Sequence, residues 1–331
     1  MANICITGVC NRACTYCFAG MNVSGSARAV PYMTWETYLQ ALDYAQRSQA
    51  DHVRILGGEP TLHPEFAAMV SEALARNLMV KVFSNGLMPE RAVEFLQAVP
   101  QGKVIVLLNV NLLPGSGLPD VNGQQRVLER LGPAITVGLN IAHPCQSQPY
   151  PLLDLIRQYK LAPTMRVGIA HPRIGGSNQA LHPRYYATVG RRLGSFMAHA
   201  KGEGISVGLD CGFVPCMFPE EAREILKEQH FGASPCIPVL DILTTGELIS
   251  CYPLEALGQV PLSATADAAA LRTLFESKLS QVRQTTLFPD CVECREYLSH
   301  ECPGGCLAAS LRRLRGASGQ EVRAGDFPVV V

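Results

Sequence analysis

Residues 3–17, NICITGVCNRACTYC, join an apolar segment to three closely spaced cysteines. The segment 3–9 has the apolar character of a short buried strand, and Cys10, Cys14 and Cys17 follow where that strand ends. In a parallel barrel, the loops after the strands form the face that carries the chemistry. This stretch therefore predicts three thiols on the functional face of a parallel sheet.

The sequence up to residue 210 alternates short apolar segments with segments of helical periodicity. Strands are predicted at 3–9, 53–56, 79–84, 104–110, 135–141, 164–170 and 206–209. Helices are predicted at 34–49, 64–76, 89–98, 122–131, 150–159 and 185–201. Such alternation is typical of βαβ units around a parallel sheet. About six repeats predict an α/β fold, a partial (β/α)6 TIM-like barrel.

Cysteines, prolines and short turns replace this alternation after residue 210, where the only long helical segment is predicted at 266–283. We therefore place a boundary between a barrel core of residues 1–210 and a small, irregular, cysteine-rich domain of residues 211–331. In the second domain a Thr-Thr-Gly-Glu turn separates 239–243 from 248–251, which predicts a β-hairpin.

Length and composition narrow the class of protein. The 331 residues are 47% hydrophobic and 17% charged, enough apolar material for a large α/β core. The 28 basic and 28 acidic residues cancel, which argues against a nucleic-acid or membrane partner. We find no signal peptide and no apolar segment of membrane-spanning length, so we expect a cytoplasmic protein. In that reducing compartment, the 13 cysteines indicate metal ligands rather than disulfides.

The spacing of Cys10, Cys14 and Cys17 suits an iron–sulfur cluster. Three thiolates hold three irons of a [4Fe-4S] cubane and leave the fourth iron free to bind a small molecule. A zinc site is the alternative interpretation. Zinc usually requires a fourth ligand nearby, however, and the nearest histidine, His52, lies beyond a predicted helix.

The sequence CNRACTYC resembles the CxxxCxΦC signature of the radical S-adenosylmethionine (SAM) superfamily, with Tyr16 as its aromatic residue. After the second predicted strand, Gly57-Gly58-Glu59-Pro60 is similar to the family's GGEP motif, which binds the SAM amino group. Ser84-Asn85-Gly86 ends the third strand and is similar to a stretch near the SAM carboxylate and ribose in relatives.

The resemblance covers about residues 1–210 and implies further cofactor contacts. Asn109 (or Asn111) on the fourth strand and Asn140 on the fifth match positions that contact the SAM ribose or carboxylate. The implied chemistry is reduction of SAM by the [4Fe-4S] cluster, giving a 5′-deoxyadenosyl radical that abstracts hydrogen from a substrate. A flavodoxin or ferredoxin is the electron donor that the family implies.

The C-terminal cysteines resemble the SPASM extension, which carries auxiliary [4Fe-4S] clusters. Cys236-x9-Gly246-x4-Cys251 matches the first part of its pattern. The second part, Cys291-x2-Cys294-x7-Cys302-x3-Cys306, has seven residues where five are usual, and no cysteine follows it. With Cys211 and Cys216, the region has eight cysteines, enough ligands for two cubanes.

Three interpretations of these eight cysteines stay open. In the first, one cluster takes Cys216, Cys236, Cys251 and Cys306, while the other takes Cys291, Cys294, Cys302 and either Cys211 or a non-cysteine ligand. In the second, a single cluster of the shorter twitch type uses Cys236, Cys251, Cys291 and Cys294. In the third, the region binds zinc, because paired cysteines are also typical of zinc ribbons.

Other residues at predicted strand ends are candidates for contact with the substrate. Asp210 is a candidate proton acceptor, and Cys145 a candidate hydrogen-atom donor. Arg166 can hold a substrate or SAM carboxylate in a bidentate pair. His143 and His171 also lie at ends of the fifth and sixth strands.

Two substrate classes follow from the resemblance. SPASM-bearing relatives mostly modify peptides or proteins by oxidation, cross-linking or thioether formation, and this is the predicted function. The alternative is a dehydrogenase or epimerase that acts on a small molecule such as a sugar or aminocyclitol. It stays open because the cluster motif begins at residue 10, so we expect no N-terminal peptide-recognition domain of the kind that many peptide-modifying relatives carry.

Overall fold

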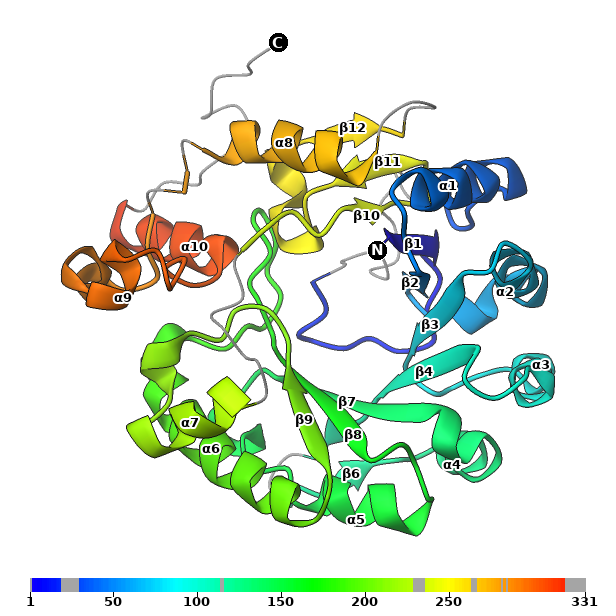
Figure 1. The fold of residues 1–331 in the computed structure, drawn as a ribbon, viewed down its shortest axis with the longest axis horizontal. Coiled ribbons are helices and arrows are strands. Elements are labelled where there is room, and N and C mark those ends of the chain that lie inside the picture. Colours follow the sequence, from blue (N-terminus) through cyan, green and yellow to red (C-terminus); the bar gives the residue numbers. More distant parts are fainter. Residues whose placement is uncertain are drawn as a thin grey trace.

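One curved sheet of ten strands organises the chain, in the order β12-β11-β10-β1-β2-β3-β4-β7-β8-β9. The computed structural model describes residues 2–18, 30–113, 116–228, 236–262, 267–280, 282–283 and 285–318. Figure 1 shows the strands curving around an open centre, with helices on the outside. The predicted α/β partial barrel is confirmed.

The barrel strands from β1 to β9 run parallel to one another. They are β1 (Ala2–Thr7), β2 (His52–Gly57), β3 (Met79–Ser84), β4 (Val104–Asn109), β7 (Ile135–Ile141), β8 (Thr164–Ile169) and β9 (Ser206–Leu209). The helices between them are α1 (Trp35–Arg47), α2 (Phe66–Ala75), α3 (Glu90–Ala98), α4 (Gln125–Leu131), α5 (Pro151–Gln158) and α6 (Tyr186–Gly202). Each lies within a few residues of its predicted range.

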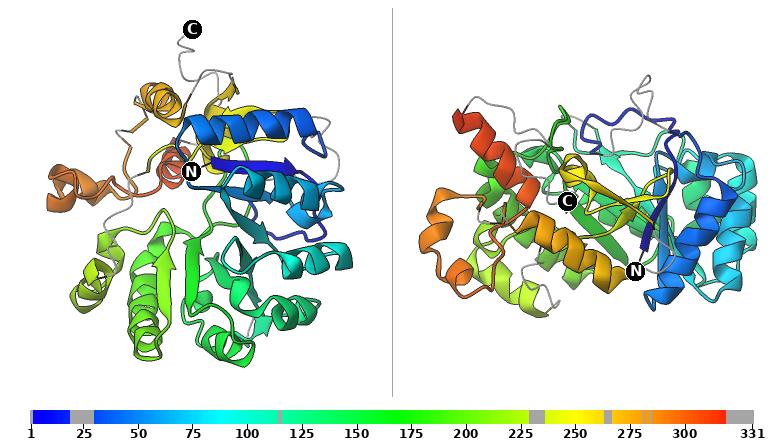
Figure 2. Two further views of the ribbon diagram at one scale, coloured as in Figure 1. Left: turned by 45° about the vertical axis from the view of Figure 1, so that its right-hand side comes forward. Right: turned by 90° about the horizontal axis from the view of Figure 1, so that it is seen from above.

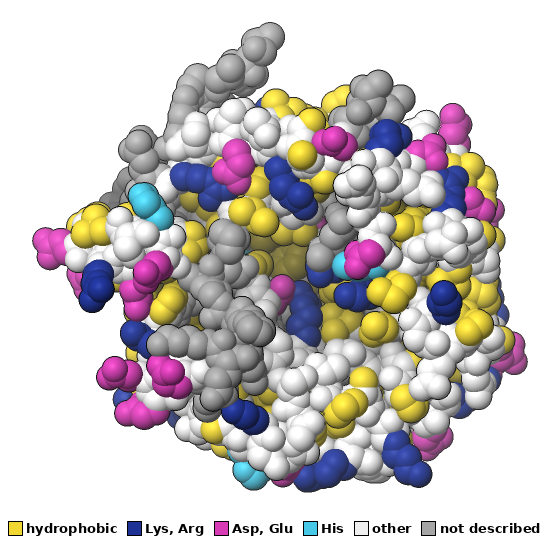
Figure 3. Space-filling view, viewed as in Figure 1, with side chains coloured by type: hydrophobic (Ala, Val, Ile, Leu, Met, Phe, Trp, Pro, Cys, Tyr) yellow, Lys and Arg dark blue, Asp and Glu magenta, His cyan; other side chains and the backbone are white. Residues whose placement is uncertain are grey.

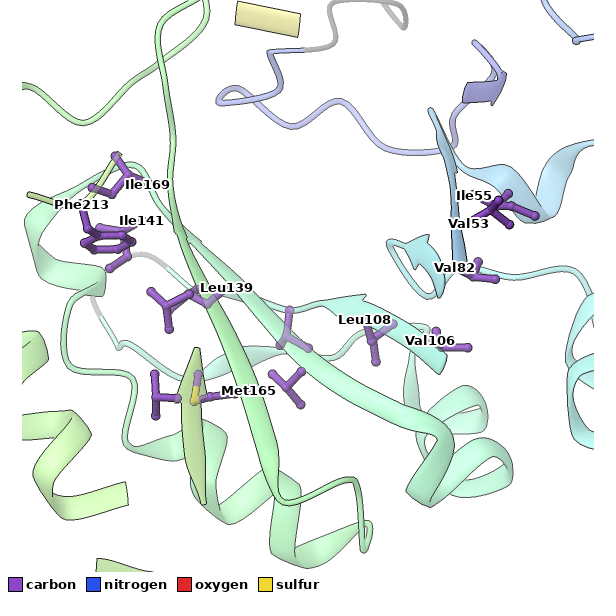
Figure 4. Close-up of a cluster of buried hydrophobic side chains, with 14 of the residues drawn as sticks. Val53, Ile55, Val82, Val106, Leu108, Leu139, Ile141, Met165, Ile169 and Phe213 are labelled. Carbon is purple, nitrogen blue, oxygen red and sulfur yellow. The ribbon is translucent and has the colours of Figure 1, made fainter. Parts of the chain in front are cut away.

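Side chains alternate across each barrel strand. On β2, Val53 and Ile55 are fully buried against the helices, in the apolar layer that Figure 4 shows. Arg54 lies between them and projects to the other face, toward the open centre. It is paired in register with Asn3 on β1 and Lys81 on β3. A polar row therefore lines the barrel, and Figure 3 shows basic side chains beside a hollow over its centre.

The segment after residue 210 extends the sheet of the barrel. β10 (Asp241–Ile242) pairs in parallel with β1, and Asn3 Nδ2 donates to Asp241 Oδ1 at 2.6 Å. β10 forms a hairpin with β11 (Glu247–Ile249), as predicted, and β12 (Gln259–Pro261) continues it. Figure 2 shows this hairpin beside β1. The segments before and after residue 210 share one sheet, and the structure marks no division between them there. The domain boundary at residue 210 therefore stays a prediction.

Short elements complete the fold. The helices are α7 (Glu220–Glu228), α8 (Ala268–Leu279), α9 (Arg295–Leu298) and α10 (Leu307–Ser318), and a small ribbon joins β5 (Asn111–Leu112) to β6 (Pro119–Asp120). The 3-10 turns are η1 (Pro60–Leu62), η2 (Gly132–Ala134), η3 (Pro144–Gln146), η4 (Pro183–Tyr185), η5 (Pro215–Met217), η6 (Tyr252–Leu257) and η7 (Pro289–Glu293).

The helices after residue 210 differ from the prediction in one respect. The segment 266–283 was expected to be the only long helix after residue 210, and it is present as α8. α10 is just as long, because Leu307, Ala308 and Leu311 form a buried stripe that holds it against the core. Among the helices that the structure describes, none combines the length and apolarity needed to cross a bilayer.

Candidate functional site

The three N-terminal cysteines lie on the loop that follows β1, which we call the cysteine loop (residues 8–18). The GGEP turn after β2 holds this loop through two backbone hydrogen bonds of 2.8 Å, from Gly58 N to Thr7 O and from Glu59 N to Val9 O. A Cβ atom on Gly57 would lie 2.3 Å from Thr7 O, and one on Gly58 would lie 2.3 Å from Val9 O. Side chains here would push the turn away from the loop, so both positions require glycine.

The Glu59 side chain points into the protein and is fully buried. Its carboxylate accepts hydrogen bonds from Thr61 Oγ1 at 2.6 Å, Ser84 Oγ at 2.9 Å and Asn85 N at 2.7 Å. Burial raises the pKa of this carboxyl, although these donors oppose the rise. The acid of the GGEP turn therefore ties the turn to the end of β3. The next residue, Pro60, is buried and begins η1.

Asn85, at the end of β3, contacts the cysteine loop directly. Its Nδ2 donates to Cys10 Sγ at 3.5 Å and to Asn11 Oδ1 at 2.9 Å. Gly86 follows with φ of +79°, and after this turn Leu87 O accepts from Asn11 Nδ2 of the loop at 2.8 Å. The S-N-G stretch and the GGEP turn, which were predicted separately, thus meet at Cys10.

Tyr16 begins a chain of polar side chains, which we call the asparagine ladder (Asn109, Asn111 and Asn140). The Tyr16 hydroxyl donates to Asn111 Oδ1 at 2.6 Å and accepts from Asn109 Nδ2 at 2.7 Å. Asn140 Nδ2 then donates to Asn109 Oδ1 at 2.9 Å. Burial first, and then the neighbouring Cys14, raise the pKa of the tyrosine. The structure therefore brings the predicted strand-end asparagines to the aromatic residue of the cysteine loop.

Arg166 on β8 and Asp210 after β9 form an ion pair. The guanidinium also lies over the ring of Phe83, 5.3 Å from its centroid. Burial, followed by the charge of Arg54, lowers the pKa of Arg166 to about 10. A Cβ on Gly168 would lie 2.7 Å from Asn140 Oδ1, so this glycine makes room for the ladder beside the pair. Arg166 and Asp210, which were predicted as separate site residues, therefore form one ion pair.

Cys145 is exposed on η3, after β7. Its Sγ lies 2.9 Å from His143 Nδ1, and the His143 ring lies 6.3 Å from that of Tyr185. Arg192 on α6 donates to Pro144 O. These contacts attach the Cys145 turn to the helical layer, and its role as a hydrogen-atom donor stays a prediction.

Four of the eight C-terminal cysteines form a first thiol group: Cys211, Cys236, Cys251 and Cys306. A small cavity is lined by Cys211, Cys236 and Cys306 together with Gly212, Phe213 and Gly305. The Cys251 thiol belongs with them, because Cys236, Cys306 and Cys211 add to burial in raising its pKa.

His171, a predicted strand-end candidate for contact with the substrate, lies instead against this first thiol group. Its Nε2 is 3.1 Å from Cys211 O and 3.7 Å from Cys211 Sγ. A Cβ on Gly212 would lie 2.1 Å from His171 Cε1. Burial lowers the pKa of His171, but the Cys306 and Cys211 thiols outweigh burial and raise it overall. Its position directly after a predicted strand was the available signal.

The other four cysteines form a second thiol group: Cys216, Cys291, Cys294 and Cys302. Burial and then the charges of Cys302, Cys291 and Cys294 raise the pKa of Cys216 to about 11. Cys302 is buried, and Cys291 and Cys294 likewise add to the effect of burial on its pKa.

These two thiol groups differ from the predicted pair of clusters in that Cys211 and Cys216 exchange places. Cys211, not Cys216, lies with Cys236, Cys251 and Cys306, because Gly212 and His171 hold Cys211 beside that cavity. The four cysteines of the alternative twitch-type cluster are divided between the two groups, and that alternative stays a prediction.

Iron–sulfur clusters fit the donor set of these cysteines. A cubane takes one thiolate on each iron, which spreads its ligands more widely than those of a single ion. The two C-terminal groups supply four thiols each, and the cysteine loop supplies three. Within the described ranges, no three His, Cys, Asp or Glu side chains are placed to hold one metal ion.

A model of the radical SAM superfamily matches residues 4–112, which include the cysteine loop, the GGEP turn, the S-N-G stretch and most of the asparagine ladder. This part of the chain matches the radical SAM superfamily. An S-adenosylmethionine-dependent nucleotide dehydratase of Selenomonas ruminantium is 33% identical over 85 residues, 25% of this chain and 29% of that protein. Mycofactocin maturase MftC of Mycobacterium tuberculosis is 33% identical over 90 residues, 26% of this chain and 22% of that protein. The matched segments thus span less than a third of these relatives.

Solved structures share the fold over a greater length than the radical SAM domain alone. Native anSMEcpe with bound AdoMet has a TM-score of 0.64 and 17% sequence identity, covering 92% of this chain and 88% of that chain. Streptococcus suis SuiB bound to its precursor peptide SuiA has a TM-score of 0.64 and 16% identity, covering 94% of this chain and 72% of that chain. The similarity therefore includes the region of the C-terminal thiol groups.

Proposed function

We propose that this chain is a radical SAM enzyme in which Cys10, Cys14 and Cys17 ligate a [4Fe-4S] cluster and leave one iron for SAM. The convergence of the GGEP turn, Asn85 and Tyr16 on the cysteine loop carries the proposal. When bound, the cluster and SAM supply reductive cleavage of SAM to a 5′-deoxyadenosyl radical, which abstracts hydrogen from a substrate.

Different residues around the cysteine loop would bind different parts of SAM. Because the Glu59 carboxylate is occupied by Ser84, Thr61 and Asn85, the backbone carbonyls of the GGEP turn accept from the SAM amino group. The asparagine ladder offers amide groups to the ribose and carboxylate, and Tyr16 fixes their orientation.

The Arg166–Asp210 pair lies at the open centre of the barrel and would bind the substrate. Arg166 is held by both Asp210 and the Phe83 ring, so its position is fixed before a substrate carboxylate arrives. Such a carboxylate would displace Asp210 from the guanidinium, and the released Asp210 can then accept a proton from the oxidised substrate.

The substrate class that we infer is a peptide or protein, modified by oxidation, cross-linking or thioether formation. Two four-thiol groups of SPASM-like spacing support this class, since each group suits an auxiliary [4Fe-4S] cluster that passes electrons. The fold adds support, because SuiB and anSMEcpe have been solved with peptides bound. A cytoplasmic flavodoxin or ferredoxin would supply the electrons.

A small-molecule substrate is the second candidate. The match to a nucleotide dehydratase favours it, at the same 33% identity as the match to the mycofactocin maturase. Under this alternative the chain would be a dehydrogenase or epimerase that uses the same cysteine loop.

A deuterium-transfer experiment separates the two classes. Extract from cells grown in D2O is divided into a peptide fraction and a small-molecule fraction, and each is added to the reconstituted, dithionite-reduced protein with SAM. Hydrogen abstraction from a deuterated substrate moves deuterium into 5′-deoxyadenosine, which mass spectrometry detects. We expect labelled product from the peptide fraction, whereas labelling from the small-molecule fraction alone would support the second candidate.

The matched control is the triplet variant, in which Cys10, Cys14 and Cys17 are all changed to Ala. We expect it to form no 5′-deoxyadenosine, while Ser277→Ala, which changes an exposed side chain on α8, forms it normally. The absence of 5′-deoxyadenosine from the reconstituted wild type would contradict the radical SAM proposal itself.

A further inference from the structure

The second thiol group is built mainly on one short segment. Cys291 lies in η7, and Cys294 precedes α9. Cys294 N donates to Cys291 O at 3.1 Å, and Cys302 N donates to Glu296 O at 2.9 Å. The segment thus folds back on itself and brings together three thiols, one fewer than a fully ligated cubane requires.

Cys216 approaches these thiols from a different part of the fold. It lies in η5, which packs closely on α6, because a Cβ on Gly190 would lie 1.9 Å from Met217 O. Pro215 at the start of η5 and the contact between the tilted rings of Phe213 and Phe218, whose centroids lie 6.1 Å apart, fix the turn further. Cys216 is therefore held on a rigid support.

Two contacts join this support to the cysteine segment. Arg223 on α7 donates through Nε to Phe218 O at 3.1 Å and through Nη1 to Glu296 Oε1 at 3.3 Å. It bridges the end of η5 and the start of α9. The Tyr186 ring on α6 packs edge-on against Phe288 at 6.0 Å, one residue before η7. Phe218 lies two residues after Cys216 and Glu296 two residues after Cys294, so the Arg223 bridge holds the two cysteine-bearing turns side by side.

We propose that Cys216 is the fourth ligand of a second auxiliary [4Fe-4S] cluster, together with Cys291, Cys294 and Cys302. The inference rests on the proposed function, because it assigns ligands to an auxiliary cluster of that enzyme. A ligand from η5 takes the place of the additional cysteine that follows Cys306 in the SPASM pattern and that this sequence lacks.

The assignment has a consequence for the substrate. With Cys216 in the second group and Cys211 in the first, each group has four thiolates, so neither cluster keeps an iron open to a substrate. Both auxiliary clusters then act in electron transfer, and the substrate binds in the barrel near Arg166 and Asp210.

Iron content and electron paramagnetic resonance test the assignment in the triplet variant, where only auxiliary clusters remain. We expect about 8 irons per chain in the triplet variant and about 4 after adding Cys216→Ala, with one reduced-cluster signal lost. Cys145→Ala is the matched control, since it removes another exposed cysteine, and it should leave about 8.

Two further variants keep the test decisive. Cys211→Ala should remove the other signal, and Cys216→Ser, which preserves the shape of η5, should shift the g values of the second cluster alone. Retention of about 8 irons and unchanged signals in both Cys216 variants would overturn the assignment. A triplet variant without iron would instead refute the auxiliary clusters of the proposed function, and the assignment with them.

Discussion

The cysteine loop and the C-terminal thiol groups are assembled in different ways. The three thiols of the cysteine loop come from residues 10–17, whereas the first thiol group draws its members from the end of β9, both ends of a hairpin and the start of α10. An open site with three ligands is thus encoded by local spacing. A closed site with four ligands requires several distant segments to pack, and it forms only with the complete fold.

The largest expected effect comes from removing one cysteine of the cysteine loop and, in a separate variant, one cysteine of a C-terminal thiol group. Cys14→Ala should lower 5′-deoxyadenosine formation by at least about 1,000-fold, because the cluster that binds SAM loses a ligand, which corresponds to roughly 4 kcal/mol. Cys294→Ala should retain uncoupled SAM cleavage and lose substrate turnover, because it damages only an auxiliary site. Chromatography of the 5′-deoxyadenosine and of the modified substrate checks both. Equal behaviour of the two variants would remove the functional distinction between the regions.

Two glycines, one beside the cysteine loop and one beside the first thiol group, allow each site to be disturbed without removing a cysteine. Gly58→Ala places a Cβ 2.3 Å from Val9 O. Val9 is part of the cysteine loop, so the loop must shift to admit the methyl group. Gly212→Ala strains a residue with φ of +94° and meets the His171 ring at 2.1 Å. Each should destabilise its own site by about 1–3 kcal/mol.

The measurement for the glycine pair is iron content together with SAM cleavage. Both variants should fall from about 12 irons per chain to about 8, but only Gly58→Ala should lose SAM cleavage as well. Gly202→Ala is the control, because its Cβ would meet nothing within 4 Å. If Gly212→Ala abolished SAM cleavage, the two sites would be coupled more tightly than the contacts indicate.

The same contrast explains how much the sequence could predict. The barrel strands and helices were predicted within a few residues, because each follows from local periodicity and turn residues. The cysteine loop, the GGEP turn and the S-N-G stretch were predicted because each is a contiguous motif at a strand end. The hairpin of β10 and β11 was predicted for the same reason.

Features that depend on contacts between distant segments were not predictable. Spacing alone could not show that Cys211 and Cys216 belong to different groups, because both lie in one short stretch and are separated only by the packing of Gly212 on His171 and of η5 on α6. The inward direction of Glu59 depends on Ser84 and Asn85 from the next strand.

The two regions meet where β10 pairs with β1, and this junction gives the smallest predicted effect. Asp241 is buried there and accepts from Asn3 at 2.6 Å. Burial raises its pKa from 3.8 to about 6. The folded state therefore binds this proton more tightly than the unfolded state, which favours folding below the unfolded pKa. As the pH rises through about 6, that stability is lost.

Asp241→Asn removes this titration while keeping one oxygen acceptor for Asn3. Wild type should lose roughly 1–2 kcal/mol more stability than the variant between pH 5 and pH 7.5, because part of a shift of about two pKa units lies in that window. Thermal denaturation under anaerobic conditions at both pH values measures the difference, with the exposed Asp154→Asn as the control that should follow wild type. Parallel curves for wild type and Asp241→Asn would mean that the carboxylate at the junction is already compensated, with Arg54, whose charge opposes the rise in this pKa, as the residue to change next.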